Sequence, residues 1–158
     1  MSAISLFSGM GGDSLGIHNA GLDVVAYSEI ETVFQETHNL NFKDCELIGD
    51  GNIQNTTDTQ LSVYYDTIDL IFAGFPCQGF SHAGKKLPDD PRNTLFREFL
   101  RATRLIQPKY IIGENVKGLL YHEKGNTFKI LANNIIISVN IYRLGIDNKL
   151  LSQFMYGL

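Results

Sequence analysis

Cys77 is the residue with the clearest chemical potential, because it stands between an apolar run and a polar, glycine-containing loop in GFPCQGFSHAGKK. A thiol in such a setting can act as a nucleophile, whereas most unpaired cysteines are small buried hydrophobic residues. Pro76 restricts the backbone before it, and Gln78 and Ser81 follow as polar neighbours. We therefore interpret Cys77 as a candidate nucleophile and Cys45 as a buried structural residue.

A carboxyl group follows a second apolar run, where Glu114 begins the triplet ENV after YIIG. An isolated glutamate at the end of a strand is more often solvated or ion-paired than catalytic. Beside a nucleophilic thiol, however, it can hold a proton or stabilise charge that develops on a substrate. Glu114 is therefore a catalytic candidate only if the fold brings it close to Cys77.

A third group of residues could bind a cofactor. The segment LFSGMGG, residues 6–12, has glycines that let a ligand approach the backbone where a helix begins. The turn alone fits a ligand-free strand-to-helix connection equally well, and Ser14 breaks a strict GxGxxG pattern. Glu29 follows Gly9 by 20 residues, where a carboxylate can accept both hydroxyls of a ribose. Together these features favour a nucleoside-bearing cofactor.

Short apolar runs alternate with helical stretches, which predicts an α/β fold with a mostly parallel sheet and helices on both faces. The expected strands are residues 4–7, 24–29, 68–75, 110–115 and 135–142, and the expected helices are residues 14–21, 32–40, 93–107 and about 127–134. Ligands bind at the carboxyl ends of the strands in such sheets. A right-handed crossover should place the ends that carry Cys77 and Glu114 close together.

Composition limits the class of protein. The 158 residues suffice for one domain, and the net charge of −4 argues against a free-standing nucleic-acid-binding module. The cysteines lack metal-ligand spacing, so no metal site is predicted, and no apolar run is long enough to predict a membrane span. We expect an intracellular, cytoplasmic protein. The basic loop from Phe80 to Arg92 is either a solvated surface loop or a lid over an anionic substrate.

These motifs together resemble the cytosine-C5 DNA methyltransferases, over roughly residues 3–128. LFSGMGGDSLGIHNAG and SEIE are similar to the first two motifs of that family, which bind S-adenosylmethionine. GFPCQGFSHAGKK is similar to the nucleophile motif, DDPRNTLF to the next cofactor motif, and GENVKGLL to the ENV motif. The resemblance implies a Rossmann-like methyltransferase fold, in which residues 1–158 form one catalytic domain that is incomplete at its C-terminus.

The resemblance also implies a role for each matching residue. Cys77 would add to C6 of a cytosine flipped out of double-stranded DNA, with Glu114 at N3. Gln78, Ser81 and Arg92 would belong to the catalytic or DNA side. The implied cofactor-binding residues are Phe7, Ser8, Gly9, Gly11, Gly12, Glu29, Ile30, Asp50, Ile53, Pro76 and Leu95.

Two positions depart from the family pattern. Ile30 stands where the family usually has a large aromatic residue that covers the adenine. The adenine motif, commonly a GDI-like triplet, reads GDGNIQN here. Adenine could therefore contact either Asp50 or Asn52 together with Ile53, and we favour Asp50.

The resemblance ends before the later parts of the family fold, which are a QxRxR motif, a target recognition region and a last helix. We therefore expect one polypeptide of a split enzyme completed by a second polypeptide, a degenerate remnant, or a fragment. The alternative functions are a non-catalytic S-adenosylmethionine-binding module and a tRNA cytosine-C5 methyltransferase. A bacterial or phage setting is expected, or the nucleus in a eukaryote.

Overall fold

A computed structural model describes residues 1–76, 95–129 and 132 of the chain. In these residues five strands form one parallel sheet with the order β3-β2-β1-β4-β5. The strands are β1 (Ser2–Leu6), β2 (Asp23–Ser28), β3 (Glu46–Leu47), β4 (Leu70–Ala73) and β5 (Tyr110–Gly113). The helices are α1 (Gly12–Asn19), α2 (Thr32–Asn41), α3 (Asp58–Ser62) and α4 (Phe96–Ile106), followed by the 3-10 turns η2 (Lys117–Leu120) and η3 (His122–Gly125). The predicted α/β class is confirmed.

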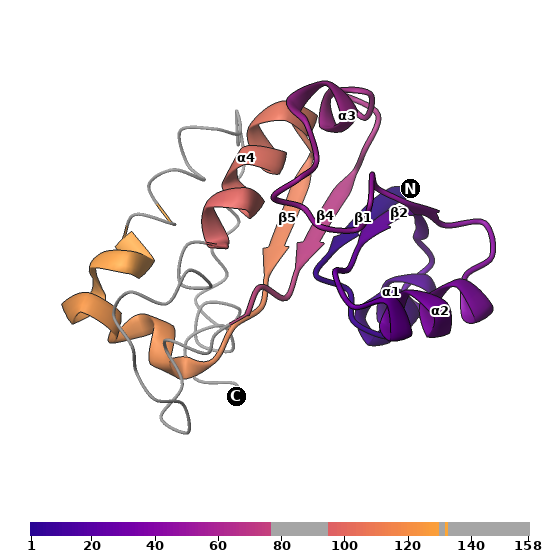
Figure 1. The fold of residues 1–158 in the computed structure, drawn as a ribbon. Coiled ribbons are helices and arrows are strands. Elements are labelled where there is room, and N and C mark those ends of the chain that lie inside the picture. The colour runs from indigo at the N-terminus through magenta and orange to yellow at the C-terminus, as the bar shows by residue number, and fades with distance from the viewer. Residues whose placement is uncertain (77–94, 130–131, 133–158) are drawn as a thin grey trace.

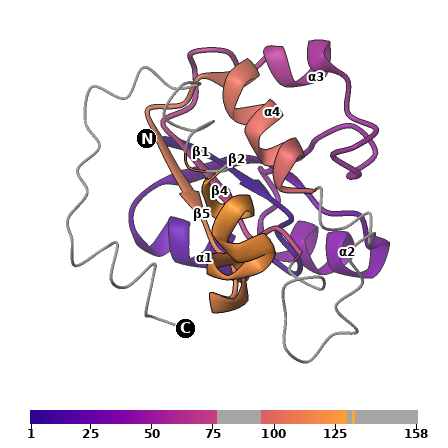
Figure 2. The same cartoon turned by 90° about the vertical axis from the view of Figure 1, so that its left-hand side faces the viewer.

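Helices cover both faces of the sheet, with α1 and α2 on one face and α3 and α4 on the other (Figures 1 and 2). The alternation of side chains along β1 explains this arrangement. Ala3 packs with Ile17 of α1, whereas Ile4 and Leu6 belong to the cluster that includes α4. All of these side chains are buried, so β1 is the centre of both hydrophobic layers.

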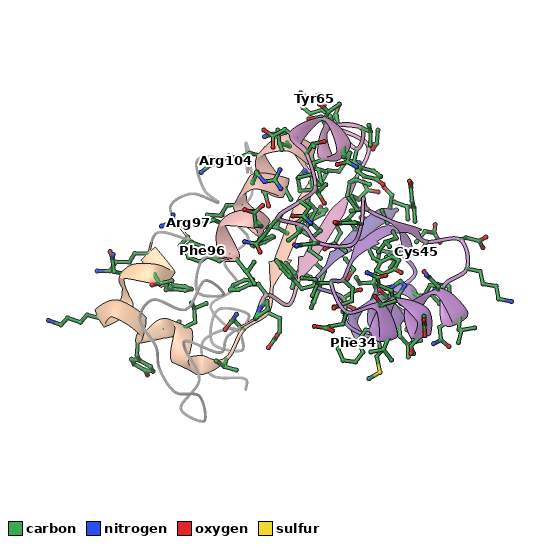
Figure 3. The ribbon with its side chains drawn as sticks, viewed as in Figure 1. Phe34, Cys45, Tyr65, Phe96, Arg97 and Arg104 are labelled. Carbon is green, nitrogen blue, oxygen red and sulfur yellow. The ribbon has the colours of Figure 1, made fainter. Side chains whose placement is uncertain are left out.

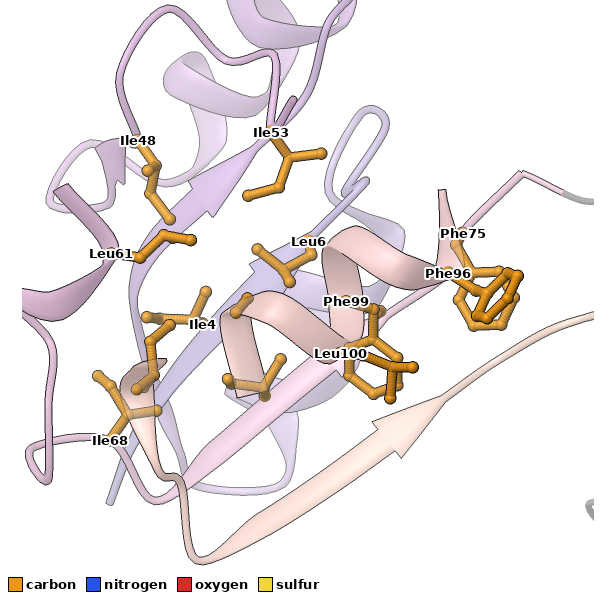
Figure 4. Close-up of a cluster of buried hydrophobic side chains, with 14 of the residues drawn as sticks. Ile4, Leu6, Ile48, Ile53, Leu61, Ile68, Phe75, Phe96, Phe99 and Leu100 are labelled. Carbon is orange, nitrogen blue, oxygen red and sulfur yellow. The ribbon is translucent and has the colours of Figure 1, made fainter. Parts of the chain in front are cut away.

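The larger core lies between the sheet and the helices α3 and α4 (Figure 4). The helical spacing of apolar residues predicted α4, and the structure buries Phe96, Phe99, Leu100 and Ile106 on its inner face. The helix ends where Gln107 adopts a left-handed conformation, with φ of 54°, just before Pro108. The labelled members of the cluster are Ile4, Leu6, Ile48, Ile53, Leu61, Ile68, Phe75, Phe96, Phe99 and Leu100.

The chain reverses its direction of travel across the sheet at β1. From β1 it goes outward through β2 to β3, then returns to add β4 and β5 on the other side of β1. A sheet with this order has a crevice at the carboxyl ends of the strands where the order reverses, and ligands bind there in α/β proteins. The strand order therefore places the loops after β1, β2 and β4 around one location.

Four elements, β3, α3, η2 and η3, were not predicted from the sequence, and one predicted strand lies outside the described residues. The strand β3 has only two residues, paired with Ala26 and Tyr27 of β2, and α3 has only five. Residues 126–129 are helical, in agreement with the start of the predicted helix near 127–134. The predicted strand 135–142 lies outside the described residues. None of the helices in the described parts has the length and apolar character that crossing a membrane requires.

Gly51, in the turn after β3, gives a direct test of this packing. Its φ is +89°, and a β-carbon there would lie 2.2 Å from the Glu29 carbonyl oxygen and 2.4 Å from Gln35 Nε2. We expect Gly51→Ala to lower the free energy of unfolding by at least about 2 kcal/mol, measured by urea denaturation.

The matched control is Gly16→Ala in α1, where a β-carbon would meet nothing within 4 Å. Alanine is the better helix former, so this variant should gain about 0.5–1 kcal/mol. Equal stability of the two variants would contradict the close approach at Gly51.

Candidate active site

The glycine turn after β1, residues 7–12, contains Gly9 and Gly11, and these two positions favour glycine for different reasons. Phe7, Gly9 and Gly11 have φ values of 60°, 56° and 94°. A β-carbon at Gly9 would meet nothing within 4 Å, so the backbone there is open to a ligand. A β-carbon at Gly11 would lie 2.6 Å from the Phe42 ring and 2.9 Å from the His38 ring. Gly11 is thus required by packing against α2, and Gly9 leaves room on the open side.

Glu29 holds this turn to the end of β2. Its side chain is 9% exposed, its Oε2 accepts a hydrogen bond from the Gly9 N–H at 2.8 Å, and its Oε1 accepts one from the Glu31 N–H at 2.8 Å. The predicted proximity of Gly9 and Glu29 is therefore present in the structure. Each carboxylate oxygen has a second lone pair, so the group can still accept hydrogen bonds from a pair of ligand hydroxyls.

Other strand-end contacts fix the same turn. The Ser8 N–H donates to the Ser28 carbonyl at 3.0 Å, and the Phe7 N–H donates to Ser28 Oγ at 3.3 Å. The Ser8 side chain is buried, and its Oγ has no hydrogen-bond partner in the described structure. The backbone of the turn is therefore held to the end of β2, while one buried hydroxyl stays unpaired in the described structure.

His38 of α2 lies directly under the turn. It is fully buried, its Nε2 is 2.9 Å from Ser14 Oγ, and its ring stacks on Tyr27 at a centroid distance of 3.7 Å. Burial lowers the pKa of His38 from 6.5 to about 4, so the ring is neutral at pH 7. Sequence reasoning missed this residue, since a single histidine in an amphipathic helix gives no signal that separates it from a surface residue.

Two further titratable groups near this turn, Cys45 and Asp13, have raised pKa values. Burial, with the nearby Asp13 and Glu46 carboxyls, raises the pKa of the Cys45 thiol to about 12. The predicted role of Cys45 as a buried structural residue is confirmed, because its side chain is 8% exposed and its thiol is protonated at neutral pH. Burial also raises the pKa of Asp13, against the lowering effect of a hydrogen bond from Ser5.

The loop after β3 carries the predicted adenine contacts. Asp50 is exposed, and its two carboxylate oxygens accept hydrogen bonds from Asn55 Nδ2 at 2.8 Å and from the Asn52 N–H at 2.9 Å. These hydrogen bonds lower the pKa of Asp50. The Ile53 side chain is 3% exposed and belongs to the core, so its backbone is the part that a ligand could reach. Within the described residues the Ile53 N–H has no hydrogen-bond partner.

The ends of β4 and β5 are adjacent, as predicted. The Glu114 N–H donates to the Ala73 carbonyl at 2.8 Å, and Asn115 Nδ2 donates to the Phe75 carbonyl at 2.8 Å. A β-carbon at Gly74 would lie 3.7 Å from Glu114 Oε2, which places that carboxylate beside the end of β4. Glu114 is exposed and therefore accessible to a substrate.

The remaining predicted residues differ in their exposure. Ile30 is 61% exposed, and Phe7 is partly buried against the larger core. Gly12 is exposed at the start of α1, and Leu95 is half-buried immediately before α4. Pro76 is half-buried after β4. The predicted catalytic residues Cys77, Gln78, Ser81 and Arg92 lie outside the described residues. In the described parts of the chain, no group of three histidine, cysteine or acidic side chains could hold a metal ion.

Comparisons with known proteins agree with this architecture. The family model described as C-5 cytosine-specific DNA methylase matches residues 1–157. The type II methyltransferase M.Eco47II of Escherichia coli is 41% identical over 135 residues, which cover 85% of this chain and 31% of that protein. The type II methyltransferase M.HhaI of Haemophilus parahaemolyticus is 32% identical over 156 residues, which cover 98% of this chain and 44% of that protein.

A solved structure gives the same result in three dimensions. The crystal structure of a putative DNA modification methyltransferase encoded within a prophage of E. coli superposes with a TM-score of 0.72 at 32% identity. That match covers 85% of this chain and 37% of the other. The chain spans about a third of the length of the curated relatives M.Eco47II and M1.HphI, 31% and 35% respectively.

Glu29→Gln tests the hydrogen bonds that hold the glycine turn. A glutamine side chain has one acceptor oxygen, so its NH₂ group would face one of the two N–H groups that now donate hydrogen bonds to Glu29. We expect the free energy of unfolding at pH 7 to fall by about 1–3 kcal/mol, measured by urea denaturation. Glu31→Gln, at an exposed neighbouring position, is the control and should have little effect. A Glu29→Gln variant as stable as that control would contradict the assignment.

The lowered pKa of His38 should make the folded protein less stable in acid. Its folded pKa is about 4 and its ordinary value is 6.5, so as the pH falls through this range the unfolded chain binds a proton that the folded chain excludes. Stability should therefore fall, by about 2 kcal/mol between pH 7 and pH 5.

His38→Gln should remove that loss, as measured by urea denaturation at the two pH values. The partly buried Asp13 carboxyl acts in the opposite direction, because its raised pKa favours the folded state as the pH falls. The difference between the variant and the unmodified chain therefore isolates His38. An equal loss in both proteins would show that His38 is not the group responsible.

Proposed function

The chain belongs to the C-5 cytosine-specific DNA methylase family, and from this membership and its site geometry we propose that it forms the catalytic and cofactor-binding part of a DNA (cytosine-5-)-methyltransferase. The observation that carries the proposal is the position of Glu114. Its carboxylate lies beside Gly74, three residues before Cys77 in the chain. The strand end that leads to the candidate nucleophile thus already has an accessible carboxyl group next to it.

S-adenosylmethionine is the proposed cofactor, and the described residues fit it. The Glu29 carboxylate offers acceptors to the ribose hydroxyls, and the open backbone at Gly9 allows close approach. Asp50 and the Ile53 N–H offer one acceptor and one donor, which match the N6 amino group and N1 of adenine. Phe7, Ile30, Pro76 and Leu95 are the proposed apolar contacts. The cofactor, when bound, supplies a methyl group on a sulfonium centre.

The chain's own residues would activate the cytosine. The Cys77 thiolate would add to C6, forming a C–S bond and moving electron density toward C5, while Glu114 would hold a proton at N3 to neutralise the developing charge. C5 then becomes nucleophilic enough to accept a methyl group. Removal of the C5 proton by a base would expel the thiolate and restore the aromatic ring.

The DNA must be held by more than the described residues. A base inside a stacked duplex is inaccessible to this chemistry, so the cytosine must be flipped into the site. The net charge of −4 leaves few cations for phosphate contacts. We therefore propose that double-stranded DNA is bound with a further part, equivalent to the rest of the relatives' length, on this polypeptide or a second one. The proposed location is the bacterial cytoplasm.

Covalent trapping tests the proposed chemistry. Cytosine that carries fluorine at C5 cannot lose that substituent, so the C–S bond to Cys77 should persist on mixed-sequence duplex DNA containing 5-fluorocytosine. The assay would add S-adenosylmethionine and the C-terminal part of a relative as a separate polypeptide, and score a denaturation-resistant adduct. We expect Cys77→Ser to abolish the adduct and Glu114→Gln to slow its formation by about 10²–10⁴-fold.

Cys45→Ala is the matched thiol control and should keep trapping, because Cys45 is buried just before β3, away from the ends of β4 and β5 (Figure 3). An adduct that survives Cys77→Ser would refute the assigned nucleophile. Cofactor binding without an adduct under every complementing condition would instead support a non-catalytic binding module. Trapping on tRNA but not on DNA would support the RNA alternative.

A further inference from the structure

Arg101 of α4 holds this helix to a stretch of chain that lies 43 to 48 residues earlier in the sequence. Its Nη2 donates to the Ile53 carbonyl at 2.8 Å and to the Thr56 carbonyl at 2.9 Å. Its Nη1 donates to Asp58 Oδ1 at 2.7 Å, and its Nε donates to Glu98 Oε2 at 2.8 Å. One guanidinium therefore connects α4, the start of α3 and the loop after β3.

The two carbonyl contacts distinguish Arg101 from an ordinary surface ion pair. Exposed pairs of this kind contribute about 0–1 kcal/mol, because both partners stay solvated and mobile. The Arg101 side chain is only 27% exposed, and within the described residues neither carbonyl accepts another hydrogen bond. The planar guanidinium holds its donors in a fixed geometry that a lysine ammonium cannot reproduce. Arg101 therefore fixes the backbone position of the loop as well as pairing with carboxylates.

The loop that Arg101 holds is the one proposed to contact adenine. Asp50 closes one side of the loop through its hydrogen bonds to Asn52 and Asn55. On the other side Arg101 binds the carbonyls of Ile53 and Thr56. The spacing between the Asp50 carboxylate and the Ile53 N–H thus depends on both sets of contacts.

We propose that Arg101 is a positioning residue for adenine recognition, because it keeps the Asp50 carboxylate and the Ile53 N–H in the spacing that pairs with the N6 amino group and N1 of the base. The inference rests on the cofactor assignment made above. Leu95, another proposed cofactor contact, precedes the same helix. Arg101 therefore also fixes the distance between the apolar contact at the start of α4 and the polar contacts in the loop.

Hypoxanthine gives a direct test, because its hydrogen-bond donor and acceptor at positions 1 and 6 are the reverse of those of adenine. Adenine has a donor at N6 and an acceptor at N1, whereas hypoxanthine has an acceptor at O6 and a donor at N1. Calorimetric titration of the full chain with S-adenosylhomocysteine and with S-inosylhomocysteine should show the adenine ligand bound at least about 10-fold more tightly. In Arg101→Lys the adenine ligand should bind about 10-fold more weakly, while the inosine ligand changes by less than about threefold.

Two variants serve as controls. Arg97→Lys changes an exposed arginine on the same helix (Figure 3) and should leave both affinities unchanged. Asp58→Asn removes one carboxylate partner of Arg101 but keeps both carbonyl contacts, so its ratio of affinities should stay near that of the unmodified chain. Circular dichroism would verify that each variant is folded.

The outcomes separate this inference from the proposal on which it rests. Equal weakening of both ligands in Arg101→Lys, or no change in either, would overturn the positioning role while leaving the cofactor assignment intact. Failure of the unmodified chain to bind S-adenosylhomocysteine would overturn both. If Arg101→Lys does not fold, Asp58→Asn combined with Glu98→Gln should lower the ratio of affinities about threefold, because no carboxylate is then left to orient the guanidinium toward the two carbonyls. An unchanged ratio would then overturn the inference.

Discussion

The Glu29 carboxylate is the contact on which the proposed cofactor site depends. Burying an ionised carboxyl group is costly unless its oxygens receive hydrogen bonds. Glu29 receives them from the N–H groups of Gly9 and Glu31, at the ends of two adjacent strands. Charge-assisted hydrogen bonds of this kind are stronger than neutral ones, so the same contact stabilises the turn and leaves lone pairs for a ligand. Gly51 extends this arrangement, because it packs directly on the Glu29 carbonyl and so sets the position of the loop after β3. This loop, residues 50–56, is the proposed adenine loop.

The two faces of the sheet differ in how they support the strand ends. The face that carries α3 and α4 is apolar, and its aromatic side chains include Phe75 and Phe99, whose ring centroids are 6.1 Å apart. Beneath the glycine turn, by contrast, the packing includes polar groups, among them His38 and Ser14. Burial keeps the His38 ring neutral, so the histidine adds no positive charge beneath the turn.

The sequence predicted the parts of the fold that carry a repeated pattern. The strands β1, β2, β4 and β5 come from apolar runs, and α4 from apolar residues at helical spacing. The strand β3 has two residues, too few to show any period, and its position became clear only through its pairing with β2. The proximity of Gly9 to Glu29, and of Glu114 to the end of β4, followed from the rule that parallel strands gather their carboxyl ends at one edge.

Contacts between distant segments could not be predicted in this way. Arg101 reaches partners 43 to 48 residues earlier in the chain, and no local pattern specifies which loop will lie against α4. His38 was missed for a similar reason, since its burial depends on Gly11, Ser14 and Tyr27 in other elements. The sequence also left open whether Asp50 or Asn52 contacts adenine. The structure shows both taking part in one hydrogen-bonded loop, in which Asp50 keeps an exposed carboxylate.

The position of α4 relates the proposed cofactor site to the proposed chemistry. This helix is the crossover between β4 and β5, and the chain reaches it directly after the segment that contains Cys77. Phe75 and Phe96, on either side of that segment, are both buried in the larger core. The ends of the segment are therefore fixed by the same packing that positions Arg101 and the adenine loop. Asn115 donates a hydrogen bond to the Phe75 carbonyl, and the Glu114 N–H donates one to the Ala73 carbonyl. Glu114 is therefore held to the same end of β4 from which the chain continues to Cys77. A change in the packing of α4 should consequently affect the loop after β3 and the strand end that leads to Cys77 together.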